Sequence, residues 1–297
     1  MHKSGFVNII GLPNVGKSTL MNAMIGEKLS IVSPKAQTTR KRIIGIVNTE
    51  DYQIVFNDTP GILQPQYKMQ QAMAKVVSEA IKDADIMVYL IEANMNEIVA
   101  SGWLDGMNTD AKIFVVINKI DMILPSMLDR KLDFWRNHKS VVEAIGVSAL
   151  EKTNLNILMG KLVEHLPEGE AYYSKEDLSD RNTRFFCGEY IREKIFLQFA
   201  EEIPYHTDVL VMDYVEKPDI DVIIATIIVN KESHKKIMIG KNGDAIKKLG
   251  TAARKDIEAF IGKKAFLELS VKVVEDWISS EHQLKKLGYI DYNHTKF

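Results

Sequence analysis

The feature that most constrains the fold is an octapeptide that follows an apolar run near the N-terminus. Residues 11–18 read GLPNVGKS, directly after the apolar residues 6–10 and at the start of an amphipathic stretch at residues 17–25. This spacing matches a phosphate-binding loop, in which glycines let backbone N–H groups turn inward around phosphates at a helix N-terminus. The sequence therefore predicts a strand, a phosphate loop and a helix in this order.

The residue types within this loop suit particular phosphate contacts. Lys17 supplies a positive charge at the β- and γ-phosphates, and the hydroxyl of Ser18 suits Mg²⁺. The alternative is a glycine-rich turn that happens to precede a lysine, and the flanking strand and helix argue against it. We expect the phosphates to be bound by Gly11, Asn14, Val15, Gly16, Lys17, Ser18, Thr19 and Gly61.

The first 166 residues alternate short apolar runs with longer amphipathic stretches, which is typical of strands and crossover helices in a mostly parallel α/β sheet. Only three residues separate the second strand from the third, so these two are expected to form an antiparallel hairpin at the sheet edge. We expect strands at residues 6–10, 43–48, 52–57, 86–91, 113–117 and 144–147, and helices at residues 17–25, 69–82, 128–138 and 154–165.

A short acidic turn, Asp58-Thr59-Pro60-Gly61, directly follows the third predicted strand. A carboxylate at the C-terminal end of a strand beside a phosphate loop can hold Mg²⁺ through water. Gly61 lets its backbone N–H approach the γ-phosphate where a side chain would obstruct it. Such a turn is weak evidence when it stands alone. After a phosphate loop, it predicts part of a nucleoside triphosphate site.

The nucleotide base is indicated by Asn118-Lys119-Ile120-Asp121, which follows the strand at residues 113–117. The carboxylate of Asp121 can accept two hydrogen bonds from N1–H and the N2 amine of guanine, which adenine does not offer. The alternative is an aspartate that caps a helix. After the last strand of the sheet, a backbone N–H at residues 148–150 could reach guanine O6. We therefore expect a guanine site at Asn118, Lys119, Asp121, Ser148, Ala149 and Leu150.

In this order the boxes resemble those of the translation-factor-related small GTPases, over about the first 170 residues. The resemblance implies that residues 33–40 form the first switch segment, with Thr39 closing over Mg²⁺ and the γ-phosphate and Thr38 as a competing candidate. Two threonines that simply enter the next strand are the plainer interpretation. The resemblance also makes Asp58, Thr59 and Pro60 part of a switch and Ser18, Thr39 and Asp58 the Mg²⁺ site.

Ile62 occupies the position where many GTPases place the glutamine that orients the attacking water. GTP hydrolysis is therefore expected to be slow without help. Related GTPases with asparagine at position 14 can hold K⁺ there, so Asn14 is a candidate K⁺ ligand. An asparagine that only hydrogen-bonds within the loop is the alternative, and both stay open.

A proline and a glycine at residues 167–169 end the first domain, and a polar, acidic stretch follows. We expect a GTPase domain at residues 1–170, a linker at 171–183, an α+β domain at 184–280 and a tail at 281–297. Within the second domain we expect a helix at residues 184–201, strands at 209–215, 222–229 and 265–273, and a helix on each side of Gly250.

The sequence Gly240-Lys241-Asn242-Gly243 lies between an apolar approach and a helical stretch, as the GxxG loop does in KH domains, where it clamps a nucleic-acid backbone. Residues 231–264 carry ten basic and four acidic side chains, a local charge of +6 in a chain with a net charge of −2. A solvated helix face is the alternative for the lysines alone. The predicted RNA-binding residues are Gly240, Lys241, Asn242, Gly243, Lys235, Lys236, Lys247, Lys248 and Arg254.

A GTPase domain followed by a KH-like domain of this size resembles the bacterial Era GTPases, over nearly the whole chain. That family is also matched by three short segments of the second domain, which are residues 191–194 (IREK), residues 202–204 (EIP), and residues 272–273 with the Trp277 that follows them. The resemblance implies a GTP-hydrolysing switch that binds the 3′ end of small-subunit ribosomal RNA, assists assembly of that subunit and associates reversibly with the inner membrane. Tyr205-His206-Thr207 departs from the family pattern, and the tail after Glu281 has no interpretable motif.

Two other classes remain open, a P-loop phosphotransferase and an RNA-binding adaptor with a structural nucleotide site. The guanine box argues against the first, and Lys17, Ser18 and Asp58 argue against the second. The single cysteine excludes an internal disulfide, and the chain starts without a secretory pattern or a long apolar run. A cytoplasmic monomer with, at most, peripheral membrane contact is therefore expected, and its activating partner cannot be deduced.

Overall fold

The computed structural model describes residues 1–290, which divide into two compact units. The first unit comprises Met1–Gln64 and Met73–Asp180, and the second comprises Pro65–Ala72 and the chain from Arg181 onward. Each unit has its own sheet. Among the described residues, none of the helices is long and apolar enough to span a membrane.

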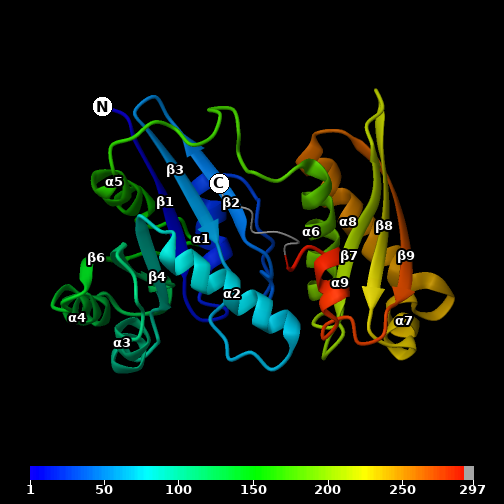
Figure 1. Ribbon diagram of the computed structural model, residues 1–297, viewed down its shortest axis with the longest axis horizontal. Coiled ribbons are helices and arrows are strands. Elements are labelled where there is room, and N and C mark those ends of the chain that lie inside the picture. The colour runs from blue at the N-terminus through cyan, green and yellow to red at the C-terminus, as the bar shows by residue number, and fades with distance from the viewer. Residues whose placement is uncertain (291–297) are drawn as a thin grey trace. The chain divides into compact units, whose positions relative to one another are not determined.

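The first unit is built on a six-stranded sheet in the order β2-β3-β1-β4-β5-β6 (Figure 1). All neighbouring strands are parallel except β2 and β3, which form the predicted antiparallel hairpin. The strands are β1 (Lys3–Ile10), β2 (Ile43–Asn48), β3 (Tyr52–Asp58), β4 (Ile86–Glu92), β5 (Lys112–Asn118) and β6 (Val141–Gly146).

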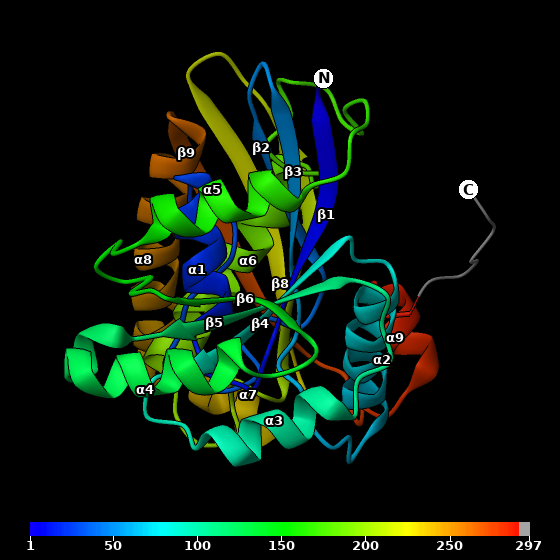
Figure 2. The same cartoon turned by 90° about the vertical axis from the view of Figure 1, so that its left-hand side faces the viewer.

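Helices cover both faces of this sheet. On one face, α2 (Lys68–Lys82), α3 (Glu97–Asp105) and α4 (Pro125–Arg136) contribute Val77, Leu104 and Trp135 to an apolar core with β4 and β5. On the other face, α1 (Lys17–Ile25) and α5 (Leu155–His165) are in contact, as Figure 2 shows. The sequence did not predict α3, a short helix that starts at the side-chain cap of Asn96.

The acidic stretch after residue 170 runs along the β2–β3 edge of the sheet within the first unit. The buried side chain of Gln53 accepts hydrogen bonds from the backbone N–H groups of Tyr172 at 2.7 Å and Tyr173 at 3.0 Å. The N–H of Ile46 in the edge strand donates to the carbonyl of Leu178 at 2.9 Å. This stretch therefore covers part of a sheet edge that would otherwise offer unpaired backbone groups.

The second unit carries three strands in the order β7-β8-β9, with β8 antiparallel to β7 and parallel to β9. The strands are β7 (Thr207–Val215), β8 (Ile220–Val229) and β9 (Lys264–Val273). In β9 the side chains of Leu267, Leu269, Val271 and Val273 are less exposed than those between them, as their alternation predicted.

Helices α6 (Thr183–Gln198) and α8 (Asp244–Ile261) lie side by side against these strands (Figure 1). Helix α7 (Glu232–Ile239) leads into η2 (Lys241–Gly243), and α9 (Glu281–Lys286) follows β9. The expectation of a helix break at Gly250 was wrong, because α8 runs through this residue. A Cβ at this position would lie 3.4 Å from Leu269 of β9, which is an ordinary van der Waals contact. The chain breaks instead at Gly240 and Gly243. Residues 291–297 of the predicted tail lie outside the described residues.

Candidate functional site

The octapeptide at residues 11–18 connects the end of β1 to the start of α1. It borders a cavity of about 270 Å³ at the C-terminal edge of the sheet, where ligands bind in open α/β folds. One wall of the cavity is formed by residues of this loop, namely Pro13, Asn14, Gly16, Lys17, Ser18 and Thr19. Residues 31–35 and 37–39 form a second wall. Gly61 and Lys119 complete the lining of the cavity.

Lys17 is 6% exposed and its ammonium is folded back onto its own loop. Its Nζ donates hydrogen bonds to the carbonyl oxygens of Gly11 at 3.1 Å and Leu12 at 2.9 Å. Burial lowers the pKa of Lys17 to about 8, and the charge of Asp58 partly opposes this shift. The ammonium is thus desolvated beside two neutral acceptors, which favours exchange of these carbonyls for an anion.

Three side chains from separate segments converge beside this lysine. The hydroxyl of Ser18 donates to Oδ2 of Asp58 at 2.6 Å, and that of Thr39 donates to the same oxygen at 3.1 Å. The two hydroxyls are 2.8 Å apart. The hydroxyl of Thr38 instead donates to the carbonyl of Lys35 at 2.7 Å. The geometry therefore groups Thr39, and not Thr38, with Ser18 and Asp58.

Asp58 is fully buried, and its second oxygen, Oδ1, has no hydrogen-bond partner. Burial raises the pKa of Asp58, while the hydrogen bond from Ser18, the charge of Lys17 and the hydroxyls of Ser30 and Thr39 act in the opposite direction. The Ser30 hydroxyl lies near the carboxylate but outside hydrogen-bond geometry. A buried carboxylate oxygen without a partner is costly, and a hard cation would satisfy it together with the two hydroxyls.

Asn118, at the end of β5, joins the loops of the predicted guanine site to the phosphate loop. Its amide nitrogen donates to the carbonyl of Val15 at 2.8 Å, and its amide oxygen accepts from the N–H of Ala149 at 3.0 Å. Gly16 has a φ of 99°, and a Cβ there would lie 2.3 Å from the Asn118 amide nitrogen. The glycine is therefore required by both its backbone conformation and this contact.

The remaining guanine-side residues lie around Asn118. Lys119 lines the cavity and pairs with Glu92 at 3.1 Å, while Asp121 in the short helix η1 (Ile120–Met122) is exposed to solvent. Ser148 is buried, and its hydroxyl accepts from the N–H of Glu151 at 3.2 Å. Leu150 is 75% exposed.

The acidic turn after β3 is fixed to the strands beneath it. The hydroxyl of Thr59 donates to the carbonyl of Ile9 at 2.8 Å, and Pro60 is buried. The N–H of Ile62 donates to the carbonyl of Gly11 at 3.1 Å, and its side chain packs against the apolar core under α2 and α3. The side chain of Ile62 therefore lies among apolar side chains and offers no hydrogen-bonding group.

Gln37, in the predicted switch segment, also lines the cavity, although it was not among the predicted site residues. Its backbone φ is 59°, and that of Asn14 across the cavity is 66°. Left-handed conformations of residues other than glycine cost about 1–3 kcal/mol and cluster at functional sites, although asparagine adopts them more readily than most.

In the second unit the four predicted loop residues form the turn between α7 and α8. Gly240 has a φ of 74°, and a Cβ there would lie 2.6 Å from Cβ of Ala245 and 2.9 Å from its backbone nitrogen. Asn242 has a φ of 54°. Lys241 and Asn242 are exposed at the tip, where the N-terminus of α8 begins. The loop thus presents an exposed cation at a helix N-terminus.

A groove of about 360 Å³ lies between α8 and β9. It combines two exposed cations, Lys247 and Arg254, with apolar side chains, among them Phe266, which is 50% exposed. Lys248 lines the next hollow along α8 with Arg254, and Lys235 and Lys236 lie on α7. Phe266 was not predicted, since a single aromatic residue in an alternating strand carries no signal. The groove is lined by Ile246, Lys247, Gly250, Thr251, Arg254, Phe266, Leu267 and Leu269.

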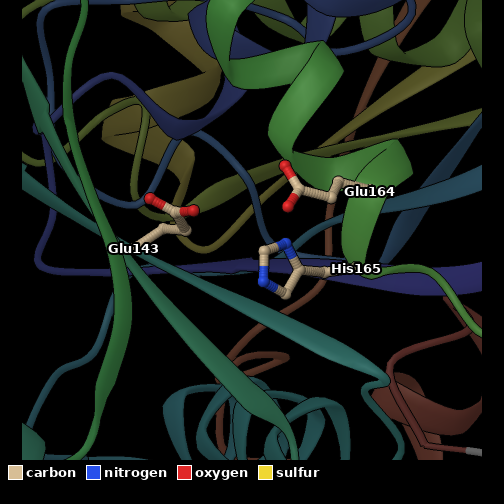
Figure 3. A group of neighbouring side chains, drawn as sticks. All are labelled: Glu143, Glu164 and His165. Atoms are coloured by element: carbon tan, nitrogen blue, oxygen red, sulfur yellow. The ribbon is translucent and has the colours of Figure 1, made fainter.

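Figure 3 shows Glu143 of β6 with Glu164 and His165 at the end of α5, whose donor atoms lie within 4.8 Å of one another. The ammonium of Lys161 lies 3.0 Å from a carboxylate oxygen of each glutamate. Hydrogen bonds to Glu143 and Glu164 raise the pKa of Lys161. Because the lysine already bridges both carboxylates, we interpret the cluster as an ion-pair network.

Comparison with known proteins was made by sequence and by fold. A family described as "50S ribosome-binding GTPase" matches residues 6–119, and a KH domain family matches residues 202–278. The chain is 41% identical over 292 residues to the GTPase Era of Caldanaerobacter subterraneus, covering 97% of this chain and 98% of that protein. It is 42% identical over 295 residues to a chloroplastic Era-like GTPase of Oryza sativa, covering 97% of this chain and 70% of the rice protein.

Two solved structures match the fold over nearly the whole chain. One is Era in complex with MgGDPNP and nucleotides 1506–1542 of 16S ribosomal RNA, with a TM-score of 0.91, 35% identity and coverage of 98% of this chain and 100% of that one. The other is a variant of Aquifex aeolicus Era bound to GDP and AlF4⁻, with a TM-score of 0.91, 34% identity and coverage of 97% and 100%.

Proposed function

This chain belongs to the Era family of GTPases, and from this membership we propose that it couples GTP hydrolysis to binding of small-subunit ribosomal RNA during assembly of that subunit. The observation that carries the proposal is the convergence of Ser18, Thr39 and Asp58 beside Lys17 in one unit, with a GxxG loop next to a basic and aromatic groove in the other.

Binding of the phosphates is assigned to the loop between β1 and α1. Gly11, Asn14, Val15, Gly16 and Thr19 offer backbone groups, and the ammonium of Lys17 exchanges the carbonyls of Gly11 and Leu12 for β- and γ-phosphate oxygens. Gly61 lines the cavity beside Pro13, where its N–H can meet the γ-phosphate. Thr59 and Pro60 hold this turn on the end of the sheet.

Selection of guanine is assigned to the loops that Asn118 joins. Asp121 accepts hydrogen bonds from guanine N1–H and the N2 amine, and a backbone N–H at Ser148, Ala149 or Leu150 donates to O6. Lys119 lines the cavity, where its aliphatic stem can pack on the base. Asn118 holds these loops in place through its bonds to Val15 and Ala149.

Mg²⁺ is proposed at Ser18, Thr39 and Asp58, with Thr38 outside the set because its hydroxyl is bound to Lys35. The support is chemical, since two hydroxyls and a buried carboxylate with one unpartnered oxygen are oxygen donors of the kind that Mg²⁺ prefers. When bound, the ion neutralises negative charge on the β- and γ-phosphates.

Hydrolysis is expected to be slow in the free protein, because Ile62 is packed into the core and offers no polar group to water. An added positive charge at the phosphates is worth on the order of 10³ to 10⁵ in rate in related enzymes. We propose that K⁺ at Asn14 supplies part of this charge. Equal turnover in sodium and potassium buffers would remove the support for K⁺.

RNA binding is assigned to the second unit. The backbone of single-stranded RNA is proposed to cross Gly240, Lys241, Asn242 and Gly243, while bases enter the groove and stack on Phe266. Lys247 and Arg254 in the groove, with Lys235, Lys236 and Lys248 on the two helices, neutralise phosphates. The description of the matched GTPase family names the 50S subunit, but that family model matches only residues 6–119. The Era–16S RNA complex matches the whole chain, so we favour small-subunit RNA.

One experiment separates this function from the two alternatives. GTP hydrolysis is measured with and without an RNA of the 3′ end of 16S ribosomal RNA, with ATP and the Lys17→Ala variant as controls. Stimulation by RNA supports the switch. Hydrolysis that is absent under all conditions supports an adaptor, and turnover that requires a small acceptor molecule supports a phosphotransferase.

The cellular setting rests on family resemblance alone. We propose a monomer that acts in the cytoplasm and contacts the inner membrane reversibly. Sedimentation of the purified protein with and without vesicles of bacterial lipid, in each nucleotide state, tests the monomer and the membrane contact together.

A further inference from the structure

A row of buried polar side chains crosses β3 and β1 of the first sheet, one residue before Asp58. Asn57 of β3 lies opposite Asn8 of β1 and opposite Ile44 of β2 in the sheet register. The amide nitrogen of Asn57 donates to the amide oxygen of Asn8, and the amide nitrogen of Asn8 donates to the carbonyl of Ala80 in α2 at 2.5 Å. Both asparagines are 0% exposed. Asn57 is thus fixed at the end of its strand by a neighbouring strand and, through it, by a helix.

The amide oxygen of Asn57 connects this row to the chain that follows the predicted switch segment. It accepts a hydrogen bond from Nε of Arg42 at 2.8 Å. Backbone pairing of β2 with β3 begins at Ile43, which lies opposite Asp58, so Arg42 is the last residue before that pairing. Its side chain therefore extends the attachment to β3 by one residue toward Thr39.

Filling the interior of the sheet does not by itself require this polar row. Two apolar side chains can replace a buried hydrogen-bonded pair at almost no cost in stability, whereas a buried amide that loses its partner costs free energy. Because Asn57 is buried, its amide oxygen favours the conformation in which Arg42 supplies the donor. The row thus selects one position for Arg42.

That position of Arg42 accompanies a particular arrangement at the candidate Mg²⁺ site. The hydroxyl of Thr39 lies 3.1 Å from Oδ2 of Asp58 and 2.8 Å from the hydroxyl of Ser18. Thr39 precedes Arg42 by three residues, and Asp58 directly follows Asn57. The hydrogen bond between Arg42 and Asn57 therefore joins the two segments close to the point where their side chains meet.

We propose that Arg42 and Asn57 are positioning residues that hold the predicted switch segment closed over Mg²⁺ and the γ-phosphate, an inference that rests on the proposed GTPase function. Neither residue lines the nucleotide cavity, and both act through Thr39. In GTPases the γ-phosphate and Mg²⁺ order such a segment, and GDP has no γ-phosphate. The hydrogen bond therefore contributes to binding of a triphosphate and not to binding of GDP.

Two substitutions at residue 42 separate the hydrogen bond from the charge. The side-chain nitrogen of glutamine stands as many bonds from Cα as Nε of arginine, so Arg42→Gln keeps a donor at this point. Arg42→Met has the same length but ends in a methyl group, and both variants lose the charge. We expect Arg42→Met to lower the affinity for GDPNP in Mg²⁺ about tenfold, while Arg42→Gln stays within about threefold of the wild type. The affinity of both variants for GDP is expected to stay within about twofold of the wild type.

A double variant tests whether the arginine acts through Thr39. In a Thr39→Ala background the hydroxyl to be positioned is missing, so adding Arg42→Met is expected to lower the GDPNP affinity no further. Arg130→Met is the control, because it removes an exposed arginine of α4 and is expected to keep both affinities. Titrations with fluorescent GDP and GDPNP analogues measure the affinities, and thermal unfolding checks that each variant is folded.

Equal losses of GDPNP affinity in Arg42→Gln and Arg42→Met overturn the proposal, because the charge alone then matters. So does wild-type GDPNP affinity in Arg42→Met, an equal fall in its GDP affinity, or an additive loss in the Thr39→Ala background. An Arg42→Met variant that fails to fold overturns it as well, because the bond then holds the fold in every nucleotide state. Wild-type protein that binds neither GDP nor GDPNP overturns the GTPase function itself, and that result needs no substitution at residue 42.

Discussion

The side-chain amide of Asn118 donates a hydrogen bond to the backbone carbonyl of Val15 at 2.8 Å, across 103 residues of sequence. The oxygen of the same amide accepts from the N–H of Ala149 at 3.0 Å. Three loops that follow β1, β5 and β6 are thus held by one side chain that is 3% exposed. This side chain thus links the predicted phosphate side of the cavity to the predicted guanine side.

Replacing Asn118 with alanine is expected to weaken both halves together. It leaves the Val15 carbonyl and the Ala149 N–H buried without their partner, which costs about 1–3 kcal/mol of unfolding free energy. Urea unfolding measures this loss, and titration with a fluorescent GDP analogue measures the accompanying fall in affinity. Asn137→Ala is the control, because its amide bonds only to the exposed end of α4. Unchanged GDP affinity in Asn118→Ala would contradict the connection.

Nucleotide affinity is expected to fall as pH rises through the pKa of Lys17. Burial lowers this pKa to about 8 in the free protein, and phosphates stabilise the charged ammonium, so the pKa rises on binding. Above about pH 8, binding takes up a proton, and each further pH unit lowers the affinity by a factor that approaches about ten. Below about pH 7 the profile is expected to be flat. Lys17→Arg keeps its charge and should remove the slope in GDP titrations between pH 7 and 9, whatever its absolute affinity.

Changing Asp121 to asparagine is expected to change the base that is preferred. The loss of hydrogen bonds to a charged acceptor costs about 3 kcal/mol, which is roughly a 100-fold loss of GDP affinity. Xanthine carries a carbonyl oxygen where guanine has its N2 amine, and the amide of asparagine can donate to it. Competition between GDP and xanthosine diphosphate should therefore shift toward the latter. Parallel losses for both nucleotides would indicate that Asp121 acts on the fold and not on the base.

The order of elements in the first unit was predictable because local chemistry determines it. The apolar runs at β4 and β5 are typical of buried parallel strands, and the three-residue gap between β2 and β3 permits only a hairpin. Helix α3 was missed because it spans nine residues and contains Gly102. Gly250 suggested a break because glycine disfavours helices, but the cost of about 1 kcal/mol for one glycine does not end a helix of 18 residues whose apolar face is buried.

Contacts between residues that are far apart in the chain could not be predicted from the sequence. Residues 171–183 were predicted to be a linker because they are polar and lack periodicity, and within them the backbone of Tyr172 is bonded to Gln53, which is 119 positions away. Gln37, inside the predicted switch segment, and Phe266, outside any motif, line the two cavities although neither was among the predicted site residues. The assignment of phosphate and guanine chemistry to the boxes stays a prediction, and the fold adds that the phosphate loop and the predicted switch segment line one cavity.

The groove between α8 and β9 predicts a measurable salt dependence. Lys247 is exposed along its wall, so its replacement by alanine removes one cation that can neutralise a phosphate of bound RNA. For single strands, each such contact contributes about 0.7 to the slope of log K against log salt concentration. Affinity for an RNA of the 3′ end of 16S ribosomal RNA, measured by fluorescence anisotropy between about 50 and 200 mM salt, should lose this increment in Lys247→Ala. Lys217→Ala in the turn between β7 and β8 removes the same charge outside the groove and should keep the wild-type slope. If both variants shift the slope equally, the effect is one of overall charge, and RNA does not follow this groove.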